Sequence, residues 1–177
     1  MNVRDKAEAM AREAVVMVCE EGLKADKIVR DAARFGWDIP ALERAHKLKI
    51  IFTTRPVFQQ ELHQADSLFL EEAAKMGARR IFVDGVAGVV SGVGGPEPRD
   101  SFHLLVQGLQ REQLTAVLAV EATALLGDHA TALPEESIAD TVIRLRMEDA
   151  SRATIRSIEI VKSRGHDFQM GRHSFRI

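Results

Sequence analysis

The amino-acid sequence predicts an α/β fold with a mainly parallel sheet and an antiparallel extension at its C-terminal end. Short apolar runs, of which Ile81-Phe82-Val83 is the clearest, have the length and composition of strands buried on both faces. Segments with helical spacing of apolar residues separate these runs, which is the pattern of parallel β-α-β units. The last part of the chain instead predicts one strand after another, which favours antiparallel pairing.

The size and composition indicate one globular domain in solution. A chain of 177 residues is ordinary for a single domain, and we expect residues 1–177 to form it. Cys19 is the only cysteine, the N-terminus has no apolar signal-peptide core, and no apolar run approaches the roughly 20 residues that cross a bilayer. We therefore expect a cytoplasmic protein with no membrane contact. The net charge of −2 and an aromatic content of 5% without tyrosine argue against nucleic-acid binding.

The N-terminal half alternates between expected helices and strands. We expect helices over residues 4–13, 25–35, 40–46 and 59–76, and strands over residues 14–19 and 49–54. Gly36 is placed to end the second of these helices as a C-cap, and Pro40 fits the first turn of the third.

The C-terminal half continues this alternation and then changes to strands. After the strand that ends at Asp84 we expect a Gly-rich loop over residues 91–98, a helix over 101–112, a strand over 114–120, and the closing strands 141–146, 154–162 and 174–177. The residues between 120 and 141, which include Pro134, are expected to form a polar connection.

Acidic residues follow three of the expected parallel strands. Glu20 and Glu21 follow the first, Asp84 closes a middle one, and Glu121 follows a later one. Because the carboxyl ends of parallel strands meet at one edge of a sheet, these carboxylates are expected to converge there. Paired carboxylates can orient and deprotonate a water, and a lone aspartate can hold the water shell of Mg²⁺. The alternatives are a helix-start role for Glu20-Glu21 and a turn with Gly85 for Asp84.

Two basic residues near the C-terminal end form a further candidate site. Lys162 and Arg164 are two positions apart, so on a strand they share one face. Such a pair can offset the charge of a phosphate group. The alternative is an ordinary solvated strand face.

Five segments in order resemble the KaiC-like branch of the RecA-type ATPases. These segments are Val-Cys-Glu-Glu (18–21), Ala-Arg-Phe-Gly-Trp-Asp (33–38), Arg-Arg-Ile-Phe-Val-Asp (79–84), Pro-Glu-Glu-Ser-Ile-Ala-Asp-Thr-Val-Ile-Arg-Leu (134–145) and Ile-Val-Lys-Ser-Arg-Gly (160–165). They are similar to the family's catalytic-glutamate strand, its Phe-Gly-Trp-Asp turn, its Walker B strand, the strand before its closing hairpin, and its Lys-x-Arg-Gly ending. The resemblance extends from about residue 7 to residue 177.

The resemblance implies a fold, cofactors and residue roles. The implied fold is the RecA-like three-layer sandwich with a C-terminal antiparallel hairpin, and the implied cofactors are ATP and Mg²⁺. Glu20 and Glu21 would be the general-base pair for ATP hydrolysis, and Asp84 would support Mg²⁺. Lys162 and Arg164 would reach the phosphates of a nucleotide held by a neighbouring subunit, since proteins of this family are typically hexameric rings.

The sequence departs from the family at the phosphate loop. It contains no Gly-x-x-x-x-Gly-Lys-[Ser/Thr], and Ser-Gly-Val-Gly-Gly (91–95) lacks the lysine and the hydroxyl that such a loop needs. We therefore expect a single domain without its first, phosphate-loop strand. In the family that strand lies between those matching 114–120 and 141–146. Each of these would therefore have an unpaired edge, unless the two pair together or recruit another strand.

Two functions fit these observations. The first is a fragment or degenerate form of a KaiC-like ATPase in signalling or clock-like regulation, which keeps the carboxylates for hydrolysis but not the loop that binds ATP. The second is a non-catalytic regulatory or oligomerisation module that docks on a full-length KaiC-like ring ATPase, where Lys162 and Arg164 act at the nucleotide of the partner. Independent ATPase activity stays an open question at this point.

Overall fold

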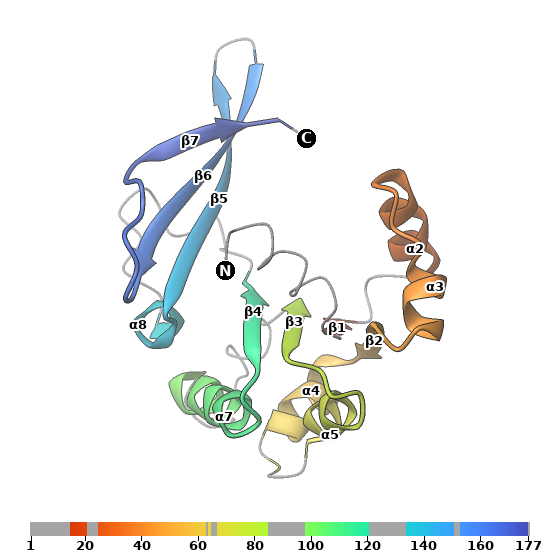
Figure 1. Cartoon of the computed structure of the whole chain (residues 1–177). Helices are drawn as coiled ribbons and strands as arrows, with labels where there is room; N and C mark the ends of the chain where they lie inside the picture. Colours follow the sequence, from red (N-terminus) through yellow and green to blue (C-terminus); the bar gives the residue numbers. More distant parts are fainter. Residues whose placement is uncertain are drawn as a thin grey trace. The chain divides into compact units, whose positions relative to one another are not determined.

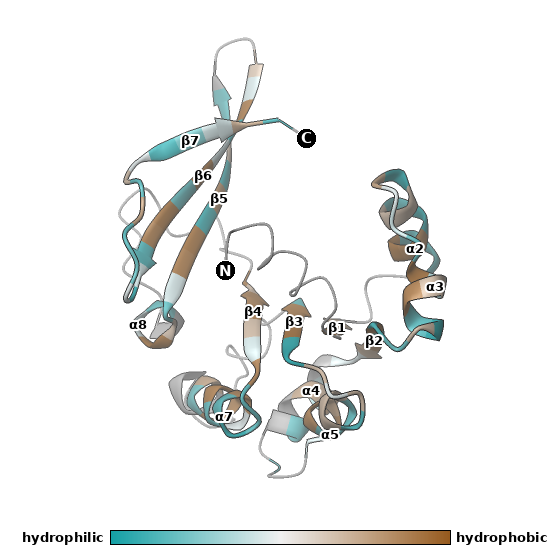
Figure 2. Cartoon of the chain, viewed as in Figure 1, coloured by the Kyte–Doolittle hydropathy of each residue, from teal (hydrophilic) through white to brown (hydrophobic). Residues whose placement is uncertain are grey.

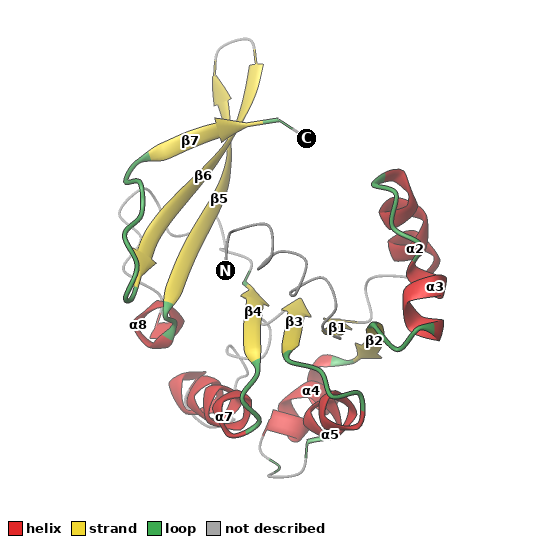
Figure 3. Ribbon diagram, in the orientation of Figure 1, coloured by secondary structure: helices red, strands yellow, loops and turns green. Residues whose placement is uncertain are grey.

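The chain divides into two compact units, Met1–Leu126 and Gly127–Ile177, and each is described here by itself (Figure 1). The computed structural model describes residues 15–20, 25–62, 64, 67–84, 98–120, 134–150 and 153–176. Figure 3 shows that the two units differ in secondary structure: the first combines helices with strands, and the second is mainly strand.

The first unit contains a four-stranded parallel sheet. Its strands are β1 (Val15–Glu20), β2 (Leu48–Thr53), β3 (Arg80–Asp84) and β4 (Thr115–Ala119), in the order β2-β1-β3-β4. The central strands β1 and β3 are the most buried, and Val16, Val18, Ile81 and Val83 all belong to the core. The parallel sheet expected from the short apolar runs is confirmed, and each strand lies within two residues of its expected bounds.

Helices connect these parallel strands, because a parallel pair needs a crossover connection. They are α2 (Ala25–Arg34) and α3 (Ile39–Arg44) between β1 and β2, α4 (Arg55–Leu62) and α5 (Leu68–Lys75) between β2 and β3, and α7 (Pro98–Arg111) between β3 and β4. The apolar core adds side chains of four of these helices to those of the sheet: Ile39, Phe58, Phe69, Ala73, Phe102, Leu105 and Leu109. The rings of Phe58 and Phe69 contact each other with centroids 5.3 Å apart.

The Phe-Gly-Trp-Asp segment forms the turn between α2 and α3. Gly36 has φ of 79°, a left-handed conformation that glycine adopts without strain, so its expected C-cap role is confirmed. The Trp37 N–H donates to the carbonyl of Ala32, which satisfies a terminal acceptor of α2. Asp38 then caps α3, because its Oδ1 accepts from the N–H of Ala41 at 2.9 Å. This segment therefore sets the angle between two helices.

The expected long helix over residues 59–76 is wrong, because two shorter helices occupy this region. α4 begins earlier, at Arg55, and ends at Leu62, and α5 begins at Leu68 after the non-helical Ser67. The buried carboxylate of Glu61 accepts a hydrogen bond from the Leu68 N–H at 2.6 Å. A side chain from the end of α4 thus satisfies a donor at the start of α5, and this contact competes with a continuous helix.

The second unit is a three-stranded antiparallel sheet with one short helix. The helix α8 (Pro134–Ile138) precedes β5 (Thr141–Ala150), β6 (Ala153–Ser163) and β7 (Arg172–Phe175), and the strand order is β5-β6-β7. The expected antiparallel closing strands are confirmed, with β5 four residues longer than expected. The sequence reading missed α8, since residues 120–141 were expected to form a polar connection.

In the middle of the β5–β6 pair one face of this second sheet is apolar and the other polar, whereas toward the turn Met147 pairs with Arg156 and Glu148 with Ile155. The register pairs Leu145 with Ile158 on one face and Arg144 with Glu159 on the other. Figure 2 shows the resulting alternation of hydrophobic and hydrophilic residues along β5 and β6. Arg144 therefore lies on the polar face, close to the start of its strand.

The strands β4 and β5 belong to different sheets. β4 ends the order of the first sheet and β5 ends that of the second, so within the described residues each pairs on one side only. The unpaired edges that the sequence predicts for these two strands are thus present in the described part of the chain. The helix expected at 4–13 and the loop residues 91–97 lie outside it.

No helix among the described residues combines the length and apolar character needed to cross a membrane.

Candidate functional site

The carboxyl edge of the parallel sheet brings two of the predicted site residues to neighbouring strand ends. β1 ends at Glu20 and β3 ends at Asp84, and the two strands pair in parallel with Val18 opposite Val83. Because the register continues along both strands, Glu20 and Asp84 end at the same edge of the sheet. The two strand ends therefore meet at one edge, and the convergence of the carboxylates themselves stays a prediction. Glu21 and Glu121 lie outside the described residues.

Asp84 is partly buried and lies near the neutral thiol of Cys19. Its side chain is half-buried, and its backbone pairs with Ala119 of β4 on the side away from β1. The buried thiol of Cys19, on β1, has its pKa raised to about 11 by burial and by the negative charge of Asp84. At neutral pH Cys19 is therefore a neutral packing residue, and the charge at this edge comes from carboxylates.

The raised pKa of Cys19 predicts a loss of stability in alkaline solution. The thiol ionises near pH 9.0 in the unfolded chain but near 11 in the folded chain, so the unfolded state loses its proton first as the pH rises. The stability that the folded thiol contributes is full below pH 9 and decreases between pH 9 and 11, by about 1.4 kcal/mol at pH 10. Urea unfolding at pH 8 and pH 10 measures this loss, and Cys19→Ala should lack it.

The absence of tyrosine from the sequence simplifies this comparison, because no phenol titrates in the same range. Lysine ionisation contributes equally to the wild type and to Cys19→Ala. If both proteins lose the same free energy of unfolding between pH 8 and pH 10, the thiol does not have the raised pKa assigned to it.

The described residues include no group of three or more histidine, cysteine, aspartate or glutamate side chains arranged to hold a metal ion. Mg²⁺ at a nucleotide site is commonly held by one or two carboxylates together with water and phosphate oxygens. The half-buried carboxylate of Asp84 at an open strand end is a suitable oxygen donor for that mode of binding.

The two predicted basic residues lie at the end of β6 in the second unit, against α8. Lys162 Nζ donates to the carbonyl oxygens of Glu136 at 2.9 Å and Ser137 at 3.1 Å. Arg164 Nη2 donates to the same Ser137 oxygen at 2.9 Å, and its Nη1 contacts Asp140 Oδ1 at 3.4 Å. Cations at a helix C-terminus satisfy carbonyls that have no partner within the helix. The structure thus brings Lys162 and Arg164 together.

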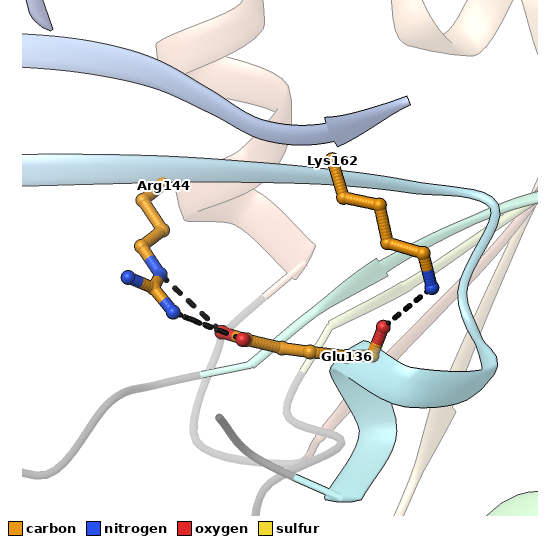
Figure 4. Close-up of polar contacts among 3 residues, drawn as sticks. All are labelled: Glu136, Arg144 and Lys162. Atoms are coloured by element: carbon orange, nitrogen blue, oxygen red, sulfur yellow. Dashed lines mark hydrogen bonds and ion pairs between the residues drawn. The ribbon is translucent and has the colours of Figure 1, made fainter. Parts of the chain in front are cut away.

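A second contact fixes α8 through its side chain. Arg144 Nη2 lies 2.9 Å from both carboxylate oxygens of Glu136, and its Nε lies 3.3 Å from Oε1 (Figure 4). The side chains of Glu136 and Arg144 are 17% and 28% exposed, so this pair is screened less than the pairs Arg164–Asp140, Arg172–Glu148 and Arg172–Glu159. A bidentate arginine–carboxylate contact of this kind fixes orientation as well as distance.

Sequence reasoning did not identify Glu136 and Arg144 as members of a cluster. Pro134 at the first position of α8 was the available signal for a helix start, because proline is favoured there. The Glu136–Arg144 contact joins residues eight positions apart, on α8 and β5. The contact of Lys162 with α8 depends instead on the β5–β6 register, which pairs Thr141 with Ser163 and so brings the end of β6 next to α8.

Comparison with known proteins gives a consistent family match. The model of the ATPase family described as KaiC matches residues 6–177. The circadian clock oscillator protein KaiC of Parathermosynechococcus lividus is 29% identical over 170 residues, which cover 92% of this chain and 31% of that protein. The circadian clock protein KaiC3 of Synechocystis sp. is 29% identical over 151 residues, which cover 81% of this chain and 30% of that protein. The chain thus spans less than a third of the length of these relatives.

Among solved structures, the KaiC-like protein of Pyrococcus horikoshii OT3 matches with a TM-score of 0.74 and 24% sequence identity. The match covers 97% of this chain and 75% of that chain. It confirms the predicted RecA-like α/β fold.

Proposed function

Because the chain belongs to the KaiC family of ATPases, we propose that residues 1–177 form one domain carrying the metal- and water-handling side of an ATP·Mg²⁺ site. The observation that carries this proposal is the parallel pairing of β1 with β3, whose ends place Glu20 and Asp84 at one edge of the sheet. Ligands of open α/β sheets bind outside that edge.

Each carboxylate has a distinct role in this proposal. Asp84 holds Mg²⁺ through its water shell, and the ion when bound offsets the charge of the nucleotide phosphates. Glu20 and Glu21 orient the attacking water and accept its proton. The neutral thiol of Cys19 adds no charge that would compete with these carboxylates.

Lys162 and Arg164 serve a different nucleotide in this proposal. We assign them to the phosphates of ATP held by a neighbouring copy, in a homo-oligomer whose subunits complete one another's sites. The exposure of the Arg164 side chain, 56%, supports this role, because a buried guanidinium would not reach a second subunit. Two relatives carry the name of circadian clock proteins, and we propose signalling or clock-like regulation for this domain as well.

We do not assign binding of the nucleotide phosphates by a phosphate loop to residues 1–177. The sequence contains no Gly-x-x-x-x-Gly-Lys-[Ser/Thr], whose backbone N–H groups and lysine supply much of the grip on a nucleotide. We expect residues 1–177 alone to show no steady ATP hydrolysis.

The test is to supply the phosphate loop and ask whether Asp84 becomes essential. A designed strand and Gly-x-x-x-x-Gly-Lys-Thr loop are fused ahead of residue 1, and Mg²⁺-dependent ATP hydrolysis is measured. We expect turnover in the fused chain and at least a roughly tenfold loss in Asp84→Asn, because the amide no longer carries the charge that the ion's water shell requires.

Asp31→Asn is the matched control, because Asp31 lies on α2 and its carboxylate pairs with the neighbouring Arg30. It should leave turnover unchanged. Steady hydrolysis by residues 1–177 without the added loop, or equal turnover in Asp84→Asn and the wild type, would contradict the proposal.

A further inference from the structure

Lys162 and Arg164, which we assign to a phosphate, are held in place by contacts with α8 before any anion binds. An ammonium group has three N–H donors and a guanidinium group has five. The contacts within the described residues use two donors of Lys162 and two of the Arg164 side chain. Donors therefore remain on both side chains for an arriving anion while the contacts with α8 persist.

Holding these side chains in place favours anion binding. Lysine and arginine side chains are long and lose much rotamer freedom when they bind a ligand. Contacts with the carbonyl oxygens of Glu136 and Ser137 restrict that freedom before the ligand arrives. Restriction in the bound geometry raises affinity because less entropy is lost on binding.

The helix that provides these carbonyls, α8, is too short to be stable without contacts to the rest of the unit. α8 has five residues, far fewer than an isolated helix needs to be stable in water. Besides its contacts with Lys162 and Arg164, α8 is attached to the sheet by the bidentate contact between its Glu136 and Arg144 on β5. Glu136 thus makes two separate contacts: its carboxylate meets Arg144, and its backbone carbonyl oxygen accepts a hydrogen bond from Lys162 (Figure 4).

We propose that Glu136 and Arg144 are positioning residues: their ion pair fixes α8, whose carbonyl oxygens hold Lys162 and Arg164 ready for the phosphate chain of a nucleotide. This inference rests on the phosphate role assigned above to Lys162 and Arg164. Neither Glu136 nor Arg144 contacts the anion in this arrangement.

The direction in which Glu136→Gln changes anion affinity distinguishes this positioning role from a simple effect of charge. Glu136→Gln removes a negative charge from the neighbourhood of both cations, and on charge alone it would strengthen anion binding. The same substitution weakens the attachment of α8, because a neutral amide replaces a bidentate carboxylate partner of Arg144. The positioning role therefore predicts weaker anion binding, opposite to the effect of charge.

The experiment titrates residues 1–177 with inorganic tripolyphosphate and follows the Arg164 Nε–Hε signal by NMR. Glu136→Gln should bind tripolyphosphate about tenfold more weakly than the wild type, the order expected when two side chains lose their prior restriction. In the absence of the anion, its Arg164 Nε–Hε group should also move more freely on the picosecond-to-nanosecond timescale.

Two variants complete the design. Glu148→Gln is charge-matched, because Glu148 pairs with Arg172 in the same sheet rather than with a residue of α8. It should bind tripolyphosphate as tightly as the wild type or slightly more tightly. Exchange of the pair, Glu136→Arg with Arg144→Glu, restores an opposite-charge contact at unchanged net charge, and should recover most of the lost affinity.

Unchanged or tighter binding in Glu136→Gln overturns the positioning role. A wild type that binds no tripolyphosphate at Lys162 and Arg164, while Arg164 gains motion in Glu136→Gln, overturns the phosphate role on which the inference rests and leaves only a structural attachment. Failure of the proposed sheet-edge site would appear separately, in the Asp84→Asn hydrolysis comparison.

Discussion

Replacement of both Glu20 and Glu21 by glutamine is expected to lower ATP turnover by about 10²- to 10⁴-fold in the chain that carries an added phosphate loop. This range is typical for the loss of a positioned general base. β1 ends at Glu20, beside the end of β3, so a water near an Asp84-supported ion would lie at the same sheet edge. Steady-state hydrolysis at saturating ATP measures the loss in kcat.

The single variants Glu20→Gln and Glu21→Gln show which carboxylate accepts the proton, because only the loss of the general base lowers turnover. ATP affinity should stay within about threefold in all of them, since a general base contributes little to ground-state binding. Glu112→Gln, which removes an exposed carboxylate that pairs with Arg111, is the control. Undiminished turnover in the double variant would remove the general-base role from this pair.

Phe69→Ala is expected to reduce the free energy of unfolding by about 3–5 kcal/mol, the usual cost of removing a buried phenyl ring. Phe69 is 6% exposed, and its ring contacts Phe58, which is 5% exposed. Its removal leaves a cavity between α4 and α5 and takes away an aromatic contact. Urea-induced unfolding followed by far-ultraviolet circular dichroism measures the change.

Phe35→Ala provides the matched control for this prediction. The same side chain is removed, but Phe35 is 66% exposed at the end of α2. We expect a loss below about 1 kcal/mol, because little apolar area returns to water. A similar loss in the two variants would show that the Phe58–Phe69 contact lies outside the cooperative core.

The sequence was sufficient for the sheet because strand signals here are local. Runs such as Ile81-Phe82-Val83 are apolar throughout, and a strand buried on both faces requires this. The helix over 59–76 was predicted wrongly for the opposite reason. Its apolar spacing continues through the break, and the break depends on the Glu61 carboxylate reaching the Leu68 N–H. Periodicity carries no information on such a contact.

The candidate site also has a part that the sequence could predict and a part that it could not. Glu20 and Asp84 were predictable because each follows an apolar strand, and parallel strands end at a common edge. The contacts of Lys162 and Arg164 with α8 were not, because they join residues 24 to 27 positions apart and their acceptors are mainly backbone carbonyls. Every non-terminal residue has such a carbonyl, so residue identity gives no sign of which ones are used.

The strand order of the first sheet has a consequence for protein synthesis. β1 is the first described strand to leave the ribosome, yet it lies between β2 and β3 and depends on both. Its second neighbour is complete only when Asp84 has been added, and at about 5–20 residues per second this delay lasts several seconds. During that time an apolar strand has one open edge. The β5–β6 hairpin, whose partners are consecutive, meets no comparable delay. The nascent chain is thus most vulnerable to aggregation before the sheet-edge site can assemble.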